Sequence, residues 1–426
     1  MELYEMRLTK RVRGMAPSLP RRLFDMAQEM GGDVIDLTLG DPDMPPPENV
    51  RTAACKAIET CRTRYSQNAG LAEAREAIAD FQRRRYGRHD VTAADVVVTV
   101  GAMGSIFQQL FSLVEPGDEV IIPAPYWVNY VEVTKLCGAV PVVVPAREEN
   151  GFSVTVAQVA AAITPRTRVI VVNSPNNPTG RVLRRETVAG IAELAVRHDL
   201  FVISDEVYRS LVYDGIPYMS IFDLPEMKGR CSIIDATSKQ FSMTGYRLGF
   251  TIGPRPLVET MTRLQENINA CAPLPSQHAA IAAYGSDTDV SYLRREYSAR
   301  RKIVVDGIRA IPGLSLDGVD AAFYAFVNIS RTGLDSQTFA YELLKRQRVA
   351  VVPGLAYGDA YDNFVRIAFT VHGDRLREAI ARIRAFVAEW DERSDLLSHF
   401  GGVLDEFARN ERCYLTQDGV YCPRCF

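Results

Sequence analysis

The sequence lacks the marks of several kinds of protein. Its 49 basic and 52 acidic residues nearly cancel, leaving a formal net charge of −3, so no strongly charged surface is expected for nucleic acid or an anionic membrane. The two longest stretches without a charged residue, 96–114 and 267–286, contain several polar residues, and we expect neither to span a membrane. The N-terminal residues, MELYEMRLTKRVRG, are charged throughout and show no signal peptide.

Cysteine is too thinly spread to predict a disulfide framework. Five of the eight cysteines are scattered through the body of the chain, at Cys55, Cys61, Cys137, Cys231 and Cys271. This usage is typical of a protein that works in a reducing cytoplasm, and we expect a cytoplasmic location.

The remaining three cysteines, Cys413, Cys422 and Cys425, cluster in the last fourteen residues. The pattern C-P-R-C occurs in zinc sites and in redox pairs. A fourth ligand would have to come from the distant His399, which is a poor spacing. We therefore predict no metal site, and expect the tail to be an extra docking segment or a partly ordered one.

What the chain does contain is a globular composition, with 47% apolar and 24% charged residues over 426 positions. Apolar runs rich in Val and Ile alternate with amphipathic helices from Pro47 onward. We expect strands at 96–100, 119–122, 140–144, 168–172, 200–204, 231–235 and 248–252. This order predicts an α/β fold with a mainly parallel central sheet covered by helices. In such sheets ligands bind beyond the carboxyl ends of the strands.

A second, smaller unit follows a long helix expected at 288–311. Its expected strands (322–329, 349–352, 364–369) and helices (336–346, 373–393) predict an α+β layer. We therefore divide the chain into an N-terminal arm with part of the small domain over 1–46, a large domain over 47–295, a small domain over 296–392, and an extra helix with the cysteine tail over 393–426. No repeat or long linker separates the two domains, so they should pack closely.

A lysine and an arginine follow the strand expected at 231–235, in the stretch T-S-K-Q-F-S-M-T-G-Y-R. Lys239 lies at the strand end, where a cleft can hold its amine, and Arg247 comes eight residues later, after the flexible Gly245. Such a lysine can form a Schiff base with an aldehyde, and such an arginine can hold a phosphate. An isolated Ser-Lys pair would more often be a surface feature.

Polar residues also follow two neighbouring strands. Asp205 and Tyr208 lie in S-D-E-V-Y after 200–204, where a carboxylate can favour the charged form of a ring nitrogen. In isolation the same aspartate would be an ordinary helix N-cap. Asn177 lies in N-S-P-N-N-P-T-G after 168–172, a turn whose Pro, Asn and Gly residues can aim one amide side chain.

Residues after the first two strands of the sheet point to an anion and an aromatic contact. Gly101-Ala102-Met103-Gly104 opens a helix, and the N–H groups at a helix start bind phosphate well. The segment is not a dinucleotide fingerprint, because Thr99 occupies the place of the first glycine. Trp127, in P-A-P-Y-W, is either a core residue or a stacking surface.

An arginine interrupts an apolar strand of the second unit, V-R-I-A-F at 365–369. Burying a charge costs free energy unless the charge is paired, so Arg366 is expected to bind an acidic group. A guanidinium is well suited to hold a carboxylate with two parallel hydrogen bonds.

Together these motifs resemble those of the class I/II aminotransferases, the fold-type I enzymes that use pyridoxal 5'-phosphate (PLP). The match runs in order from about Arg7 to Phe386, and P-Y-W-V-x-Y and V-V-N-S-P-N-N-P-T-G resemble the bacterial aspartate/prephenate aminotransferase-like subgroup. The resemblance implies cofactor-binding roles for Lys239, Asp205, Tyr208, Asn177, Trp127, Ala102, Met103, Ser238, Arg247 and Tyr65. It also implies a large domain that binds PLP and a homodimer with shared sites, in which Tyr65 of R-Y-S-Q-N-A-G reaches the cofactor phosphate of the neighbouring subunit.

The resemblance also implies how the substrate is held and converted. Lys239 is the catalytic lysine, and Arg366 binds the substrate carboxylate with help from Gly40 of G-D-P-D and from Asn177. The peptide bond between Asn177 and Pro178 is expected to be cis. These roles imply an aminotransferase that moves an amino group between an L-amino acid and a 2-keto acid.

Three positions depart from the family pattern. Ala236 replaces a serine that often touches the phosphate, and Tyr246 replaces the tryptophan of T-G-W-R. Met103 stands where members that use acidic substrates can carry a lysine, so the preferred amino acid is not expected to be strongly acidic. The same residues would also serve a PLP-dependent lyase, cyclase or oxidase, which is the alternative function. A DNA-binding head is not expected, because only about 40 residues precede Gly40.

Overall fold

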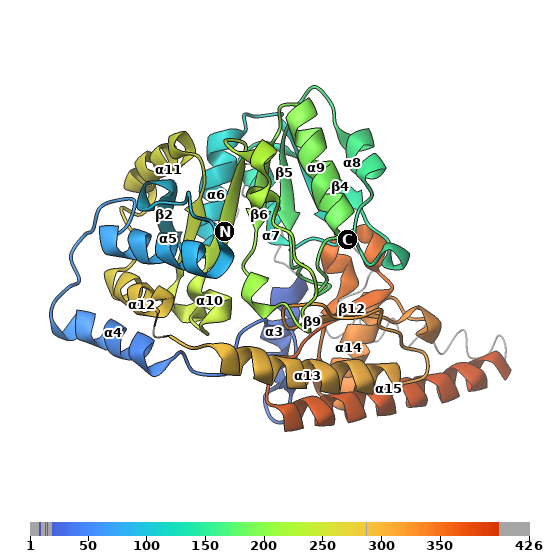
Figure 1. The fold of residues 1–426 in the computed structure, drawn as a ribbon. Coiled ribbons are helices and arrows are strands. Elements are labelled where there is room, and N and C mark those ends of the chain that lie inside the picture. The colour runs from blue at the N-terminus through green and yellow to red at the C-terminus, as the bar shows by residue number, and fades with distance from the viewer. Residues whose placement is uncertain (1–7, 10–12, 14, 16–18, 287, 400–426) are drawn as a thin grey trace.

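A central sheet organises the chain in the computed structural model, which describes residues 8, 9, 13, 15, 19–286 and 288–399 (Figure 1). Within these residues the sheet has seven strands in the order β2-β8-β7-β6-β5-β3-β4. In that order the strands are Val96–Val100, Leu248–Ile252, Cys231–Ala236, Phe201–Asp205, Thr167–Asn173, Glu119–Ala124 and Val140–Pro145. All seven lie where the sequence predicts strands, within one or two residues.

The sheet is parallel except for β8, which is antiparallel to both β2 and β7. The reason is the short link of residues 237–247 between β7 and β8. A parallel neighbour needs a crossover of about a dozen or more residues, whereas a short link returns the chain antiparallel. The mainly parallel α/β sheet expected from the sequence is confirmed.

Helices cover both faces of the sheet because successive strand residues point to opposite sides. Ile121 and Ile170 pack in one apolar cluster, and their neighbours Val120 and Val169 pack in another on the opposite face. The covering helices are α4 (Glu48–Glu59), α5 (Ala72–Tyr86), α6 (Gly101–Leu113), α7 (Asn129–Leu136), α8 (Val156–Ala162), α9 (Arg185–Arg197), α11 (Arg255–Ile268) and α12 (Leu274–Tyr284). Both faces are therefore buried, as parallel strands require.

The sequence predicts no helix where α8 lies. The helices expected in the large domain are at about 48–60, 70–86, 103–114, 127–137, 184–198, 255–268 and 275–284. It is seven residues long, too short for its apolar spacing to be distinctive. Its start is fixed by Thr155, whose hydroxyl accepts from the Gln158 backbone N–H at 3.2 Å while the Gln158 side chain accepts from the Thr155 N–H at 2.9 Å. This reciprocal pair is a capping box.

The smaller unit is built on a three-stranded antiparallel sheet in the order β11-β12-β9. Its strands and helices are β9 (Tyr324–Asn328), β11 (Val352–Pro353), β12 (Phe364–Ala368), α3 (Leu19–Met30), α13 (Ser291–Arg309), α14 (Ser336–Gln347) and α15 (Gly373–His399). Helices α13 and α15 lie side by side below it (Figure 1). Helix α15 continues unbroken past residue 393 to His399, where the sequence suggests a new segment.

One expected strand of this unit is wrong in its extent. Residues 349–352 were expected to form a single strand, but they divide between β10 (Val349–Ala350) and β11. Strand β10 pairs with β1 (Ile35–Asp36), whereas β11 pairs with β12, so the chain changes partner at Val351. The division of the whole chain at residues 46, 295 and 392 stays a prediction.

Two further observations apply to the described residues alone. None of their helices is both long enough and apolar enough to cross a membrane. They contain no group of three or more His, Cys, Asp or Glu side chains placed to hold a metal ion. The tail cysteines Cys413, Cys422 and Cys425 lie outside the described residues, as does most of the segment 393–426, in which the sequence predicts an extra helix at about 393–409.

Candidate active site

The carboxyl ends of the parallel strands bring the polar residues to one edge of the sheet. Asp205 ends β6 and is paired in register with Asn173, which ends β5. The Asn173 side chain donates to the Asp205 carbonyl at 3.3 Å and accepts from the Asn177 N–H at 3.0 Å. The peptide bond between Asn177 and Pro178 is cis, as expected. This is the edge at which parallel sheets bind ligands.

Lys239 lies just beyond β7, in the short helix α10 (Thr237–Gln240). Its Nζ donates a hydrogen bond of 2.7 Å to the carbonyl oxygen of Gly40. Burial lowers the pKa of Lys239 to about 8, because an ammonium loses solvation in this cleft. Charged side chains close enough to affect this pKa are Asp41, Arg366, Arg247 and Asp205.

Asp205 is buried and accepts a hydrogen bond of 2.6 Å from the hydroxyl of Tyr130. Burial raises the pKa of Asp205 to about 6, and the Tyr130 hydrogen bond opposes this rise. The Tyr130 ring meets Trp127 edge-on, with centroids 5.5 Å apart and planes at 82°. Sequence reasoning missed Tyr130, although the P-Y-W-V-x-Y motif contains it three residues after Trp127, in the first turn of α7.

Arg366, on β12, is only 5% exposed. Its Nη1 donates to Oδ1 of Asn177 at 3.1 Å, and its Nη2 donates to the Thr38 carbonyl. Its Nε is buried without a hydrogen-bond partner, and no described carboxylate forms an ion pair with it. The guanidinium lies over the rings of Tyr324 and Tyr357, at 4.6 and 5.5 Å. A buried cation with an unused donor is therefore available for an acidic ligand.

Tyr208 shares a hydrogen bond of 2.9 Å with the hydroxyl of Tyr324. Burial raises the pKa of both tyrosines above the usual value, so both remain neutral. A Cβ atom on Gly40 would overlap the Tyr324 hydroxyl, which explains why glycine is needed there. Sequence reasoning missed Tyr324, because its pattern predicts only a core strand.

Arg247 meets the start of helix α6. A Cβ atom on Gly101 would lie 2.5 Å from the Arg247 Nη2, and one on Gly249 would lie 2.5 Å from the Ala102 nitrogen. The first N–H groups of a helix have no partners within the helix, and its dipole is positive at this end. The guanidinium and the helix start therefore form a cradle that a phosphate group would fit.

Three other residues expected in the site have different surroundings. Ser238 is buried beside Lys239. The Met103 sulfur accepts from the Asn129 side-chain amide at 3.4 Å. Tyr65 is 87% exposed, and the contacts that join the other site residues do not include it.

The site thus combines an amine of lowered pKa, a buried carboxylate, an anion cradle and a buried arginine. These residues fit PLP, which needs a lysine for its aldehyde, an acidic partner for its ring nitrogen and a cationic cradle for its phosphate. The fold and site define a PLP-dependent enzyme of fold type I.

The chain belongs to the family Aminotransferase class I and II, which matches residues 32–383. It is 38% identical over 387 residues to the aromatic-amino-acid aminotransferase 2 of Thermococcus litoralis, covering 90% of this chain and 99% of that protein. It is also 38% identical over 392 residues to the aspartate aminotransferase of Geobacillus stearothermophilus, with the same shares covered. The structure of the aspartate aminotransferase from Thermus thermophilus with maleate superposes with a TM-score of 0.84 at 35% identity, covering 89% of this chain and 99% of that one.

These comparisons confirm the family, the fold class, the cofactor and the reaction class expected from the sequence. The protein is a PLP-dependent aminotransferase acting on amino acids. They do not favour the alternative of a lyase, cyclase or oxidase.

Proposed function

We propose that this aminotransferase takes its amino group from an L-amino acid without a strongly acidic side chain and passes it to a 2-keto acid. The observation that carries the proposal is the buried Arg366, whose Nε has no partner among the described residues and which forms no ion pair with them. A substrate carboxylate would supply both the acceptor and the missing negative charge.

The cofactor would be held by residues at the carboxyl edge of the sheet. When bound, PLP supplies an aldehyde and a ring that withdraws electrons from the substrate. We assign its binding to Lys239 at the aldehyde, Asp205 at the ring nitrogen, Tyr208 and Asn177 at the ring oxygen, Trp127 at the ring face, and Ala102, Met103, Ser238 and Arg247 at the phosphate. The close approach of Arg247 to Gly101 supports the phosphate assignment.

Lys239 would also move the substrate's α-proton. Its pKa of about 8 leaves part of the population unprotonated near neutral pH, which suits a group that must accept and return a proton. The carbonyl of Gly40, 2.7 Å from Nζ, holds the amine at the edge of the site. The negative charge of Asp205 would favour the protonated form of the ring nitrogen. Tyr130 holds this carboxylate in place through a hydrogen bond of 2.6 Å.

Arg366, Gly40 and Asn177 would orient the substrate. The Asn177 amide oxygen already accepts from Arg366, so its amide nitrogen is left to donate. Thr38 holds the other terminal nitrogen of Arg366 through its carbonyl. The guanidinium is thus fixed before substrate arrives, which reduces the entropy lost on binding.

The preference against acidic donors is proposed from Met103. Its thioether carries no charge and accepts from Asn129, so it offers no cation for a second carboxylate. The same surface includes the half-buried Trp127, which belongs with Met103 to one apolar cluster. Apolar and aromatic side chains would fit this lining.

A panel of amino acids offered with 2-oxoglutarate, scored by the glutamate formed, tests this proposal. Neutral donors should exceed aspartate in kcat/KM, and Met103→Lys should raise the value for aspartate about tenfold or more relative to a neutral donor. Lys239→Ala should bind PLP but show no turnover. Aspartate as the fastest donor would refute the donor preference, and ammonia or peroxide without glutamate would refute amino transfer.

We also propose a cytoplasmic homodimer in which Tyr65 completes the neighbouring subunit's phosphate site. The Tyr65 ring is 87% exposed in the single chain, which leaves it free to reach a neighbouring subunit and so supports this proposal. Mixing Tyr65→Phe subunits with Lys239→Ala subunits tests it. In a hybrid dimer one active site would again contain both Tyr65 and Lys239. The mixture should therefore be more active than the sum of the two variants measured separately. No gain in proven hybrids would overturn sharing.

A further inference from the structure

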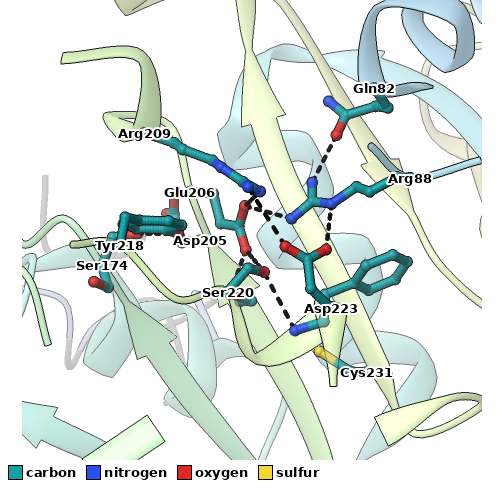
Figure 2. Close-up of polar contacts among 12 residues, drawn as sticks. Gln82, Arg88, Ser174, Asp205, Glu206, Arg209, Tyr218, Ser220, Asp223 and Cys231 are labelled. Carbon is teal, nitrogen blue, oxygen red and sulfur yellow. Dashed lines mark hydrogen bonds and ion pairs between the residues drawn. The ribbon is translucent and has the colours of Figure 1, made fainter. Parts of the chain in front are cut away.

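A second group of polar side chains lies behind Asp205, on the opposite side of the end of β6. Consecutive strand residues point to opposite faces, so Asp205 meets Tyr130 of α7 while Glu206 points away from it. The Glu206 carboxylate accepts from the Ser220 hydroxyl and from Arg88 (Figure 2). It also accepts from the Ser204 hydroxyl at 3.2 Å.

Two arginines and two carboxylates form this group, which we call the Arg88–Glu206 cluster: Arg88, Glu206, Arg209 and Asp223. Glu206 Oε2 lies 3.1 Å from a nitrogen of each arginine. Asp223 bridges the same two arginines from the other side, at 2.5 and 3.4 Å. The two positive and two negative charges balance (Figure 2).

The central ion pair is almost fully removed from solvent, with side-chain exposures of 4% for Arg88 and 1% for Glu206. Although burial alone would raise it, the pKa of Glu206 is lowered, with Arg88 and Arg209 as the main opposing charges. Arg88 also donates to Gln82 at 2.6 Å, which ties the cluster to helix α5. A buried ion pair adds little net stability compared with apolar residues of similar volume, so stability alone does not account for this one.

We propose that Arg88 and Glu206 are positioning residues for Asp205: they clamp the end of β6 and balance the charge next to the carboxylate that faces the cofactor ring. This inference rests on the proposed role of Asp205. Glu206 is its immediate neighbour, so an unbalanced charge there acts on Asp205 at short range through a medium of low dielectric.

The titratable groups that interact electrostatically with Asp205, whether or not they point toward it, come from several elements. They are Tyr130 of α7, Glu206 of the same segment, Asp235 of β7, Tyr208 after the strand and Lys239 of α10. Burial raises the pKa of Asp235 well above its usual value, which favours its uncharged form. Glu206 raises the pKa of Asp205, and Lys239 lowers it. Arg88 therefore affects Asp205 chiefly by offsetting the charge of Glu206.

The test measures PLP affinity of the full-length protein, stripped of cofactor, as a function of pH. Arg88→Met leaves the negative charge of Glu206 only partly balanced, which raises the pKa of Asp205. Because charged Asp205 is the form that should bind PLP tightly, the pH midpoint of PLP binding should rise by roughly one unit. Glu206→Gln leaves an excess positive charge, so the midpoint should fall by a similar amount. The double variant Arg88→Met/Glu206→Gln is balanced again and should return close to wild type.

Opposite shifts separate this role from a merely structural one, which would move both single variants the same way. Arg88→Lys keeps the positive charge but loses the planar guanidinium that binds two carboxylates at once. It should leave the pH midpoint of PLP binding unchanged while weakening the affinity for PLP. The control is Glu119→Gln at the other end of the sheet, whose side chain is 5% exposed and is bound to Thr164 and to the exposed Arg166. It should lower the unfolding temperature without moving the midpoint.

Several outcomes would overturn the inference. It is contradicted if Arg88→Met and Glu206→Gln shift the pH midpoint in the same direction, or if neither shifts it. It is also contradicted if Glu119→Gln shifts the midpoint as much as Glu206→Gln does. If Arg88→Met does not fold, Glu206→Gln and the double variant still give opposed expectations. Asp205→Asn separates the two proposals. If it leaves the pH dependence unchanged, the role of Asp205 is wrong; if it removes the dependence while the cluster variants have no effect, only this inference is wrong.

Discussion

Arg366 and Asn177 are joined by a hydrogen bond of 3.1 Å, although 189 positions separate them in the chain. The arginine comes from a strand of the smaller unit, and the asparagine from a turn at the edge of the central sheet. The substrate-binding end of the proposed site therefore depends on both units meeting.

Replacing Arg366 with Met should lower kcat/KM for amino acid and keto acid alike by on the order of 100-fold or more, since charge-assisted hydrogen bonds are worth ~1.5–3 kcal/mol each. The loss should appear mainly in KM, with PLP still bound by absorbance. Arg197→Met, which removes an exposed i,i+4 ion pair, serves as the control. An unchanged KM for both substrates would contradict the carboxylate role.

The pKa of Lys239 predicts a pH-dependent effect on stability. Because the folded value of about 8 lies below the ordinary 10.5, the unfolded chain binds more protons between these pH values. The cost of burying the ammonium is thus full below pH 8 and disappears as the pH rises toward 10.5. The cofactor-free Lys239→Met variant should be more stable than wild type at pH 7, by ~1–3 kcal/mol, and equal to it above about pH 10.5.

Thermal unfolding between pH 7 and 11 measures this difference. The exposed Lys345→Met is the control and should show no such pH trend. A constant difference between Lys239→Met and wild type across the range would exclude burial of the ammonium as its cause.

Tyr130→Phe should move the pH midpoint of PLP binding upward. The Tyr130 hydroxyl stabilises the charged form of Asp205, so its removal raises the pKa of that carboxyl further above about 6. Binding should weaken most on the acidic side of neutral, and a fluorescence titration with PLP would record it. Tyr292→Phe is the control, because it also removes a tyrosine hydroxyl, one that donates at 3.3 Å to the Pro45 carbonyl on the exposed surface. Identical midpoints in Tyr130→Phe and wild type would refute the coupling.

Gly40→Ala should destabilise the protein by ~1–3 kcal/mol, the usual cost of an added atom in a packed site, and should reduce activity as well. The new methyl group would overlap the Tyr324 hydroxyl. Removing that hydroxyl in Gly40→Ala/Tyr324→Phe should recover part of the stability in a denaturant titration. Gly245→Ala is the control, since a Cβ atom there meets no atom within 4 Å. A double variant no more stable than Gly40→Ala would place the clash elsewhere.

The sequence predicts the sheet well, and it also predicts the sheet edge at which the polar residues gather, because both follow from where the strands end. Asp205 and Lys239 lie after buried apolar runs, and Arg366 interrupts one. Such positions stand out in a linear pattern. The antiparallel direction of β8 was less visible, because apolar strands look alike in either direction and only the length of the preceding link decides.

The partners of these residues could not be predicted in the same way. Tyr130 and Tyr324 have the burial and periodicity of ordinary core residues, and their hydroxyls find partners 75 and 116 positions away. Arg88 looks like one more charge at the end of a basic helix, yet it meets Glu206 from 118 positions away in the interior. Only the three-dimensional packing distinguishes such contacts from a plain core or a solvated charge.

The pairing of β1 with β10 sets the order in which the protein can be completed during synthesis. Ile35 pairs with Val349, and the Thr38 carbonyl accepts from Arg366. The loop that carries Gly40 therefore leaves the ribosome long before these partners have been synthesised. The central sheet draws on residues 96–252 and can assemble earlier. The active site can therefore form only after nearly the whole chain has been synthesised. A truncated chain should fold its central sheet but have no catalytic activity.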